Sequence, residues 1–511
     1  MKALPRIAIV CLSAVLLAGC GQPSPSDAEL DGPGSAPGSA QTAPSRNLLI
    51  VLDGLRPDYV TPETMPNLYA LGERGVVFTN HHAVYPTVTR VNAASISTGA
   101  YPETHGLMGN AVFFPEVDAT RFLTTSDRAN LLRVEEAEGG QLLTAPTLGE
   151  LLQEAGERLL AVSAGSSGSS FLLNHTVAGG GIIHYEYVLP ESLAERVAQQ
   201  LGPPPTLESP SDERNRYIVD AFLEVGLDVV DPTVTFMWLT DPDTTAHVHG
   251  VGHPTSMESI RAVDAELGRL QDALEASGRR DDFNIWVTSD HGFSTHTGFV
   301  DLPALVEPFL GTLADGSPRV VAGSDAIYVR DGDADSVSGI VEALQASERV
   351  GAIFTRGGRV PGTLSFEVAR WDHPRAADIL YSPAWTDAEN EYGYRGTAAS
   401  YGTAGHGSTS PFDIHNTLIA AGPDLRSGVE VSLPSSNVDF APTILSLLGL
   451  PAGSAMAGRA LTEAFVDGPE AEGDVESDEV TAETPDAGYR VTAQTSVVAG
   501  RRYLDGATAE R

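Results

Sequence analysis

Five short and almost wholly apolar runs constrain the fold of this chain more than any other feature. They cover residues 45–52, 159–164, 233–239, 283–288 and 416–421. Strands that are buried on both faces of a parallel sheet have this continuous pattern. Segments with helical periodicity lie between the runs, at 65–74, 147–155, 212–230, 257–277 and 438–448. The alternation predicts an α/β fold with a mostly parallel central sheet flanked by helices.

This pattern predicts one main domain over residues 46–466. Within it, residues 298–403 are less regular, with a helix near 335–346, and we interpret them as an insertion or cap on the main sheet. Residues 467–488 are acidic and poor in apolar side chains, which predicts a mobile segment. Residues 489–511 predict a terminal hairpin that docks back on the main domain.

The first 45 residues predict export rather than a part of the fold. A short basic start precedes an apolar stretch over 7–17 and the sequence Leu17-Ala-Gly-Cys20. This arrangement resembles a bacterial lipoprotein signal over residues 1–20, with a lipid on Cys20 that anchors the chain in a membrane. The alternative is an ordinary signal peptide with an incidental cysteine. Residues 21–45 are rich in Pro, Gly, Ser and Ala and predict a disordered tether. We therefore expect an exported bacterial lipoprotein, on the periplasmic face of the outer membrane or on the cell surface.

The net charge argues against one class of partner, and the cysteine content argues against disulfides. The formal net charge is −37, and Lys2 is the only lysine. A strongly acidic surface argues against binding to nucleic acid, which is itself a polyanion. The only other cysteine, Cys11, lies within the predicted signal, so the mature protein has no disulfide. The sequence does not predict the oligomeric state.

Polar residues repeatedly follow or border the predicted strands. These candidate metal ligands are Asp53, Asp243, His247, Asp290, His291 and His406. Ligands of α/β sheets gather at the carboxyl ends of the strands, and buried carboxylates are costly unless something compensates their charge. Taken singly, Asp53 could cap a strand and Asp290-His291 could form a turn. Together, three carboxylates and three histidines suit two Zn²⁺ ions, which in hydrolases clamp the attacking and leaving oxygens.

The candidate nucleophile lies in the segment after Pro86. We expect a helix over about 88–98 with Thr87 at its N-terminus, where backbone N–H groups and the helix dipole favour negative charge. The alternative is that Thr87 only caps the helix. Thr89, one turn inside, is a weaker rival. Asn110 could donate its amide to a phosphoryl oxygen, or could be a turn residue after Gly109.

These motifs, in this order, resemble the alkaline phosphatase superfamily and most closely its nucleotide pyrophosphatase/phosphodiesterase branch. The matching pieces are Leu-Asp53-Gly, Pro-Thr87-Val-Thr, Thr-His-Gly…Asn110, Asp-Pro-Asp243-Thr-Thr-Ala-His247, Ser-Asp290-His291-Gly and Gly-His406-Gly. The resemblance implies one zinc ion held by Asp243, His247 and His406. It implies a second held by Asp53, Asp290, His291 and the Thr87 oxygen.

The resemblance also implies a reaction. Thr87 attacks phosphorus to give a phosphothreonine, a zinc-activated water hydrolyses it, and Asn110 holds a non-bridging oxygen. The chain departs from the branch at Ala246, where glycine is usual before the histidine, and at Arg90, where an apolar residue is usual.

We expect a small phosphorylated substrate with a phosphodiester or nucleotide pyrophosphate bond. Residues 165–170 are small and neutral where related monoesterases and phosphonoacetate hydrolases carry Lys or Arg, which leaves room for a second ester substituent. The alternative is a phosphomonoesterase or phosphonate hydrolase, if Arg56 or Arg90 supplies the missing charge. A sulfatase is disfavoured because the segment offers a threonine rather than the Cys or Ser of that branch. A silent binding protein is disfavoured because every ligand is present.

Overall fold

The computed structural model describes residues 45–511 except 207, 324 and 470–472. The predicted signal, the lipidated Cys20 and nearly all of the predicted tether therefore lie outside the described residues. Among the helices of the described part, none combines the length and the apolar character needed to cross a membrane.

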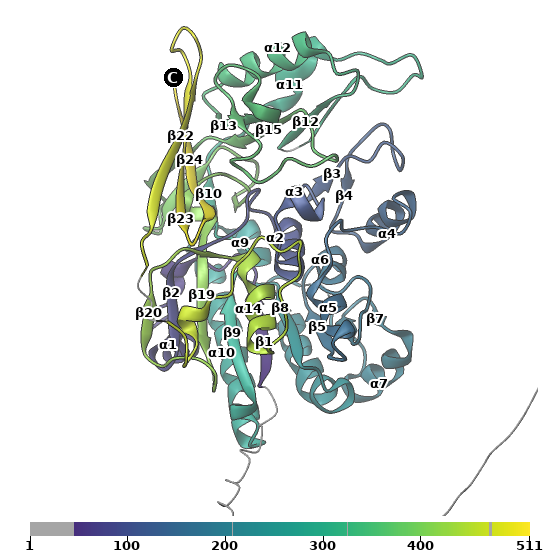
Figure 1. Ribbon diagram of the computed structural model, residues 1–511, viewed down its shortest axis with the longest axis vertical. Helices are drawn as coiled ribbons and strands as arrows, with labels where there is room; N and C mark the ends of the chain where they lie inside the picture. Colours follow the sequence, from purple (N-terminus) through teal and green to yellow (C-terminus); the bar gives the residue numbers. More distant parts are fainter. Residues whose placement is uncertain (1–44, 207, 324, 470–472) are drawn as a thin grey trace, which may run out of the picture. The chain divides into compact units, whose positions relative to one another are not determined.

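A ten-stranded central sheet confirms the predicted α/β class (Figure 1). The strand order is β20-β2-β19-β9-β1-β8-β5-β6-β7, and β21 pairs with β2. The strands are β1 (Arg46–Leu52), β2 (Val76–His82), β5 (Leu159–Ser163), β6 (Gly181–His184), β7 (Val188–Leu189), β8 (Val234–Leu239), β9 (Phe283–Thr288), β19 (His415–Ala421), β20 (Val429–Val431) and β21 (Ser435–Ser436). At the centre, β9, β1, β8, β5 and β6 run parallel, with Leu49 opposite both Phe236 and Trp286.

Two features of this sheet differ from the sequence prediction. β19 was expected to match the parallel strands, but it pairs antiparallel with both β9 and β2. A continuous apolar run reports burial on both faces and does not reveal strand direction, which explains the error. β2 was not predicted, because Val76–His82 ends in polar residues and alternates between buried and partly exposed positions.

Helices cover both faces of the sheet. The helices are α1 (Pro66–Glu73), α2 (Thr89–Thr98), α3 (Pro102–His105), α4 (Arg128–Ala137), α5 (Leu148–Glu154), α6 (Ser167–Leu172), α7 (Glu191–Leu201), α8 (Asp212–Asp220) with a π-helical continuation (Ala221–Val230), α9 (Asp243–His249), α10 (Pro254–Ala276), α13 (Pro411–Ile414) and α14 (Phe440–Leu447). Leu48 and Ile50 of β1 pack with α1, α7, α8 and α10. Leu49 and Val51 pack on the other face, with α2, α5, α6 and α14. The period-two alternation of a strand thus supplies two apolar layers.

The insertion predicted over 298–403 has a sheet of its own, which the sequence pattern did not reveal. Its strand order is β11-β12-β15-β13-β14. Its elements are α11 (Leu302–Val306), β11 (Val320–Ala322), β12 (Ala326–Val329), α12 (Ala334–Gln345), β13 (Val350–Thr355), β14 (Leu364–Ser365) and β15 (Ile379–Pro383). Strands of two to six residues carry too few positions for a periodic signal. A small sheet in the order β16-β17-β10-β18 joins the insertion to the rest of the domain. Two of its strands, β16 (Trp385–Glu389) and β17 (Arg395–Ala398), belong to the insertion, and the other two, β10 (Ser294–His296) and β18 (Ala404–Gly405), flank it.

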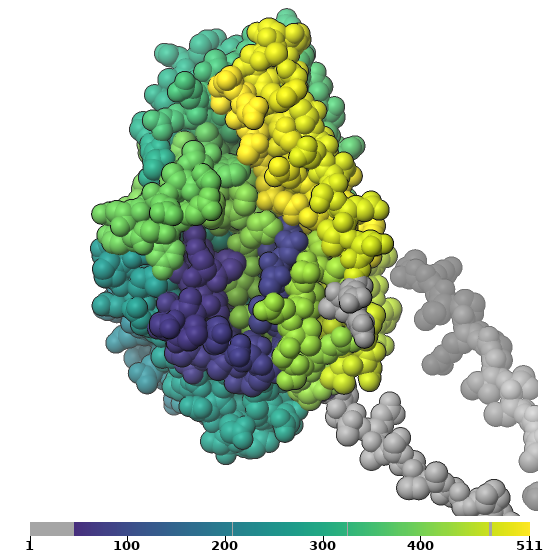
Figure 2. Space-filling model, turned by 90° about the vertical axis from the view of Figure 1, so that its left-hand side faces the viewer, coloured from purple at the N-terminus to yellow at the C-terminus, as the bar shows by residue number. Residues whose placement is uncertain are grey.

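The C-terminal residues form an antiparallel sheet of three strands, β22 (Glu476–Glu483), β23 (Arg490–Val498) and β24 (Arg501–Glu510). The acidic segment that we expected to be mobile therefore includes a strand. β22 pairs with β23 along its whole length, and its acidic side chains stay at the exposed surface. Negative charges on an exposed edge strand are tolerated and discourage further pairing. The sheet lies against the insertion (Figure 2), where the Tyr489 hydroxyl donates to Gly351 O at 2.6 Å.

Candidate metal centre

The candidate ligands meet because three neighbouring strands of the central sheet end at the same edge. Asp53 follows β1, and Asp290 and His291 follow β9, which is its neighbour on one side. β8, the neighbour on the other side, leads through a short turn to Asp243 at the first position of α9. The sequence spacing then places His247 one helical turn further along the same face. His406 enters from β18 and completes the group.

The distances group these side chains into two adjacent sets. Asp243 Oδ1 lies 3.2 Å from His247 Nε2 and 3.3 Å from His406 Nε2. His291 Nε2 lies 3.1 Å from Asp290 Oδ2 and 3.6 Å from Asp53 Oδ1. The rings of His291 and His406 stack with their centroids 3.5 Å apart, so the two sets are contiguous.

Asp53 and Asp290 each have one carboxylate oxygen that the protein satisfies and one that it does not. Trp238 Nε1–H donates to Asp53 Oδ2 at 2.9 Å, and the Gly54 N–H donates to Asp290 Oδ1 at 3.1 Å. Asp53 Oδ1, Asp243 Oδ1 and Asp290 Oδ2 are buried and have no hydrogen-bond partner. Buried acceptors without a donor are rare. These three oxygens are also the ones that approach the histidines, and divalent cations bound between them would satisfy all three.

The histidines are held in the orientation that a metal ligand needs. Their Nδ1–H groups donate to backbone carbonyls, from His247 to Ala404 O at 2.9 Å, from His291 to Gly292 O at 3.0 Å and from His406 to Thr87 O at 2.8 Å. With the proton fixed on Nδ1, each Nε2 offers its lone pair to the cluster. The donor set of carboxylate oxygens and imidazole nitrogens fits zinc.

The electrostatics of the cluster show an excess of negative charge. Burial, reinforced by the charges of Asp290 and Asp243, raises the pKa of Asp53 well above its usual value. Burial alone would also raise the pKa of Asp243, but His247 and His406 outweigh it and hold that pKa well below its usual value. Like charges at this spacing repel unless a cation lies between them. The cluster is therefore suited to divalent cations.

The structure differs from the sequence prediction at the start of the helix that follows Pro86. Helix α2 begins at Thr89, after an extended Val88. The Thr87 hydroxyl donates to Ser408 O at 2.9 Å and accepts from the Gly407 N–H at 3.1 Å. These bonds commit Thr87 to the loop that carries His406. The buried Thr89 Oγ1 instead lies 3.3 Å from His291 Nε2, at the N-terminus of α2.

Asn110 lies beside this helix terminus. Its Oδ1 accepts from the backbone N–H of Arg90 at 3.0 Å, which satisfies one of the free N–H groups in the first turn of α2. Among the described residues, no hydrogen bond uses the two amide hydrogens of Asn110. They remain able to donate to a ligand next to Thr89.

Several supporting residues could not be identified from the sequence. Trp238 lies inside an apolar strand, where nothing marks it as a partner of Asp53. Asn437 Nδ2 donates to Asp290 O and to Asn92 Oδ1, both at 2.9 Å. Only the position of Asn92, one helical turn after Thr89, gives a signal. His249 and His253, which follow His247 closely in the sequence, stack on each other, and His253 caps α10.

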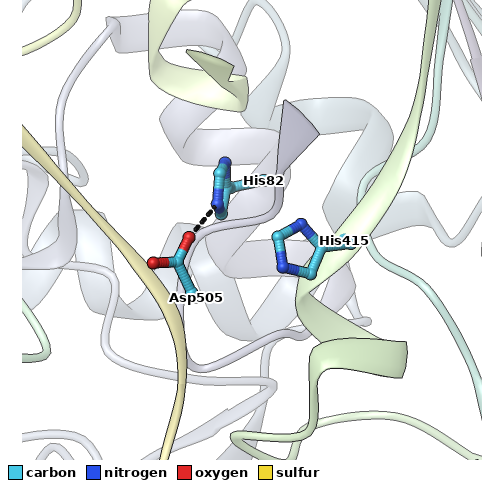
Figure 3. Close-up of side chains that lie close together, drawn as sticks. All are labelled: His82, His415 and Asp505. Atoms are coloured by element: carbon cyan, nitrogen blue, oxygen red, sulfur yellow. Dashed lines mark hydrogen bonds and ion pairs between the residues drawn. The ribbon is translucent and has the colours of Figure 1, made fainter. Parts of the chain in front are cut away.

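A second group of metal-binding side chains, His82, His415 and Asp505, lies under the C-terminal sheet (Figure 3). Here hydrogen bonds within the protein occupy the side chains of His82 and Asp505. His82 Nε2 lies 2.8 Å from Asp505 Oδ1, and His82 Nδ1–H donates to Ser435 O at 2.9 Å. The Ser496 hydroxyl donates to Asp505 Oδ2 at 2.8 Å. Asp505 is the extra residue of a β-bulge in β24, which turns its side chain toward β2. This group fastens the C-terminal sheet to the central sheet.

A cavity of about 480 Å³ adjoins the metal-ligand cluster. His406, Gly407 and Val88 line it on the side of the cluster. The insertion supplies the opposite wall, which includes Leu302 and Tyr401. A space of this size accommodates a small organic ligand.

Comparison with known proteins shows a similarity to one described family. A sequence model of the type I phosphodiesterase/nucleotide pyrophosphatase family matches residues 47–405. Ectonucleotide pyrophosphatase/phosphodiesterase family member 1 of the mouse is 28% identical over 250 residues, which are 48% of this chain and 24% of that protein. The chain thus spans about a quarter of the length of that relative. The mouse bis(5′-adenosyl)-triphosphatase is 23% identical over 417 residues, 81% of this chain and 79% of that protein.

Solved structures show the same fold. Murine ectonucleotide pyrophosphatase/phosphodiesterase 5 superposes with a TM-score of 0.57 and 19% identity, over 80% of this chain and 97% of that chain. An inactive variant of the murine protein, in which one threonine is replaced by alanine, has been solved in complex with AMP and superposes with a TM-score of 0.56 and 18% identity, over 80% of this chain and 97% of that chain.

Proposed function

Because the chain belongs to the type I phosphodiesterase/nucleotide pyrophosphatase family, we propose that it hydrolyses phosphodiester or nucleotide pyrophosphate bonds at a two-metal centre. The observation that carries this proposal is the convergence of three unpartnered carboxylate oxygens with three histidine Nε2 atoms at a buried threonine. No structural role accounts for this arrangement, because unpaired buried carboxylates destabilise a fold.

The residues present divide between two Zn²⁺ ions. Asp243, His247 and His406 would hold one, and their ligand atoms lie within 4.8 Å of one another. Asp53, Asp290 and His291 would hold the other, together with the threonine oxygen. When bound, the pair of ions supplies Lewis-acid stabilisation of the charge that develops on the attacking and leaving oxygens.

We assign the nucleophile to Thr89 in place of the Thr87 predicted from the sequence. Thr89 Oγ would form a bond to phosphorus while the ester or anhydride oxygen departs, and water would then release the phosphoryl group and restore the hydroxyl. The position of Thr89 at the N-terminus of α2 favours negative charge on its oxygen. Asn110 would donate its free amide hydrogens to a non-bridging oxygen of the phosphoryl group. Thr87 holds the His406 loop.

The cavity beside His406 supports a substrate that is larger than a simple phosphate ester. A diester or dinucleoside polyphosphate carries a second substituent, and this space lies on the side of the cluster that the insertion covers. The AMP bound to the murine relative supports a nucleotide as the substrate class. The insertion would then set the preference among leaving groups.

Two matched variants test the proposal on bis-p-nitrophenyl phosphate. Thr89→Ala should lower kcat by roughly three orders of magnitude or more, as loss of a nucleophile does, while the zinc content stays near two per chain. Thr87→Ala should cost stability, about 2–4 kcal/mol, because it leaves Gly407 N–H and Ser408 C=O unpaired in the interior, and should retain far more activity. Full activity in Thr89→Ala, or in metal-free protein, would overturn the proposal.

A further inference from the structure

Few cationic side chains of this chain could neutralise the negative charge of a phosphoryl group at this centre. Lys2 is its only lysine, so the candidates are arginines. The sequence indicates two arginines, Arg56 and Arg90. The Arg56 guanidinium already makes hydrogen bonds within the protein. Its Nη1 donates to Phe293 O at 2.7 Å, and its other nitrogens bind both oxygens of Asp58 at 2.6 and 2.9 Å.

Arg90 is placed differently. It follows Thr89 on the first turn of α2, and its backbone N–H holds Asn110. The Arg90 side chain has no hydrogen bond and no ion pair within 4.0 Å among the described residues, and its Nε is buried without a partner. Burial lowers the pKa of the Arg90 guanidinium, and the negative charges of the cluster carboxylates, Asp53, Asp243 and Asp290, oppose this shift. Arg90 is thus a partly buried cation at the centre with no counter-ion of its own.

Metal loading makes this imbalance larger. Two divalent cations exceed the charge of the three carboxylates by one, and an ionised Thr89 would cancel that excess. The guanidinium of Arg90 then adds one positive charge that none of these groups balances. An unpaired, desolvated guanidinium is costly unless an anion pairs with it. A planar guanidinium pairs well with phosphoryl oxygens.

The number of phosphoryl oxygens indicates which substrate uses this charge. A phosphodiester presents two non-bridging oxygens at the attacked phosphorus, whereas a monoester dianion presents three. In the proposed site, the metal centre would contact one non-bridging oxygen and the Asn110 amide a second. Arg90 is the group left for the third oxygen and for the second negative charge.

We propose that this centre also hydrolyses phosphate monoesters, and that Arg90 binds the additional oxygen of the monoester dianion. This inference rests on the proposed function, because it uses the same nucleophile. Thr89 Oγ bonds to phosphorus as the P–O bond to the alcohol breaks, and the alcohol takes up a proton. Water then cleaves the phosphothreonine to orthophosphate and restores the hydroxyl. The monoester product of a diester cleavage therefore becomes the next substrate.

The residues around 165–170 do not replace Arg90 in this role. Their hydroxyl groups are used within the protein, with Ser170 donating to Ser163 Oγ at 2.6 Å and Ser166 paired with Ser169 at 3.0 Å. The Ser167 hydroxyl accepts from the Arg128 N–H at 3.2 Å. The neutral segment predicted from the sequence thus packs as a helix start, and Arg90 is the cation that acts on the cluster.

The test compares wild-type enzyme and Arg90→Leu in the zinc-loaded form with two substrates. Arg90→Leu should lower kcat/KM for p-nitrophenyl phosphate by about 100-fold, the effect of losing a hydrogen bond between charged groups, and for bis-p-nitrophenyl phosphate by less than about 10-fold. At limiting diester, the wild type should release two p-nitrophenol molecules per substrate, and the variant should pause after one. The inhibition constant of orthophosphate, a readout that needs no monoester turnover, should rise by a similar 10- to 100-fold.

Two further variants act as controls. Arg90→Lys should recover part of the monoesterase activity. Arg158→Leu removes a half-exposed arginine that pairs with Asp231. It should leave kcat/KM for both substrates unchanged. Zinc content and melting temperature establish that Arg90→Leu is folded. Equal losses for both substrates, or an unchanged orthophosphate constant, would overturn the inference, as would a wild type active on the diester alone. Absence of diesterase activity would instead refute the proposed function.

Discussion

Trp238→Phe provides a quantitative test of how the protein prepares its metal ligands. The indole Nε1–H donates to Asp53 Oδ2 at 2.9 Å, and both groups are buried. A hydrogen bond from a neutral donor to a carboxylate contributes about 1.5–3 kcal/mol. Its loss leaves the ionised form of Asp53 unsupported and favours the protonated form, which cannot bind a metal. We therefore expect zinc affinity to fall by about 10- to 100-fold, measured by competition with a chromophoric chelator at neutral pH.

Trp286→Phe is the matched control. Trp286 lies in β9, next to β1, is equally buried, and donates to Asn47 Oδ1 at 3.3 Å, away from the cluster. Both substitutions remove one indole ring edge from the core and should lower the free energy of unfolding by similar amounts. Only Trp238→Phe should weaken zinc binding. Equal zinc affinities in the two variants would show that Trp238 does not hold Asp53 as a metal ligand.

Two further predictions concern stability. Burial lowers the pKa of His81 to about 3 in the folded protein, below about 6.5 in the unfolded chain, so its contribution to stability is present above pH 6.5 and is lost as the pH falls toward 3. Between pH 6.5 and 4.5 this loss amounts to about 2–3 kcal/mol of the free energy of unfolding. In metal-free protein, His81→Gln should therefore reduce the pH dependence of the unfolding free energy, obtained from urea titrations, by that amount. An unchanged pH dependence would contradict the prediction. Asp505→Ala removes the contact with His82 at 2.8 Å and should destabilise the protein by about 1–3 kcal/mol. Asp478→Ala, which breaks an exposed pair with Arg502, should cost less than about 1 kcal/mol, and equal melting temperatures would refute the proposed fastening of the C-terminal sheet.

The ligand positions could be predicted from the sequence because topology alone collects them. Asp53 and Asp290 follow runs that are recognisable as buried strands, and strands of one parallel sheet end at a common edge. Asp243 and His247 need only the helical spacing of four residues. In each case a local pattern determines where the side chain lies. No knowledge of the remaining chain is required.

The choice between Thr87 and Thr89 could not be made in this way. The two residues are separated by one extended residue, and the start of α2 decides which hydroxyl lies at the cluster. Thr87 is drawn aside by Gly407 and Ser408, which lie more than 300 residues away in the chain. Distant partners also explain the strand at 476–483, since an acidic segment forms a strand only because β23 offers it a pairing edge.

Thr89, in our proposal, accepts the phosphoryl group at this metal centre. Acid quenching of the zinc-loaded enzyme during turnover of bis-p-nitrophenyl phosphate, followed by mass spectrometry of the peptide over residues 75–90, tests it directly. This peptide contains both Thr87 and Thr89, so fragmentation locates the modification. We predict a phosphate, or its p-nitrophenyl ester, on Thr89. The same group on Thr87, or an unmodified peptide from rapidly quenched active enzyme, would contradict the assignment.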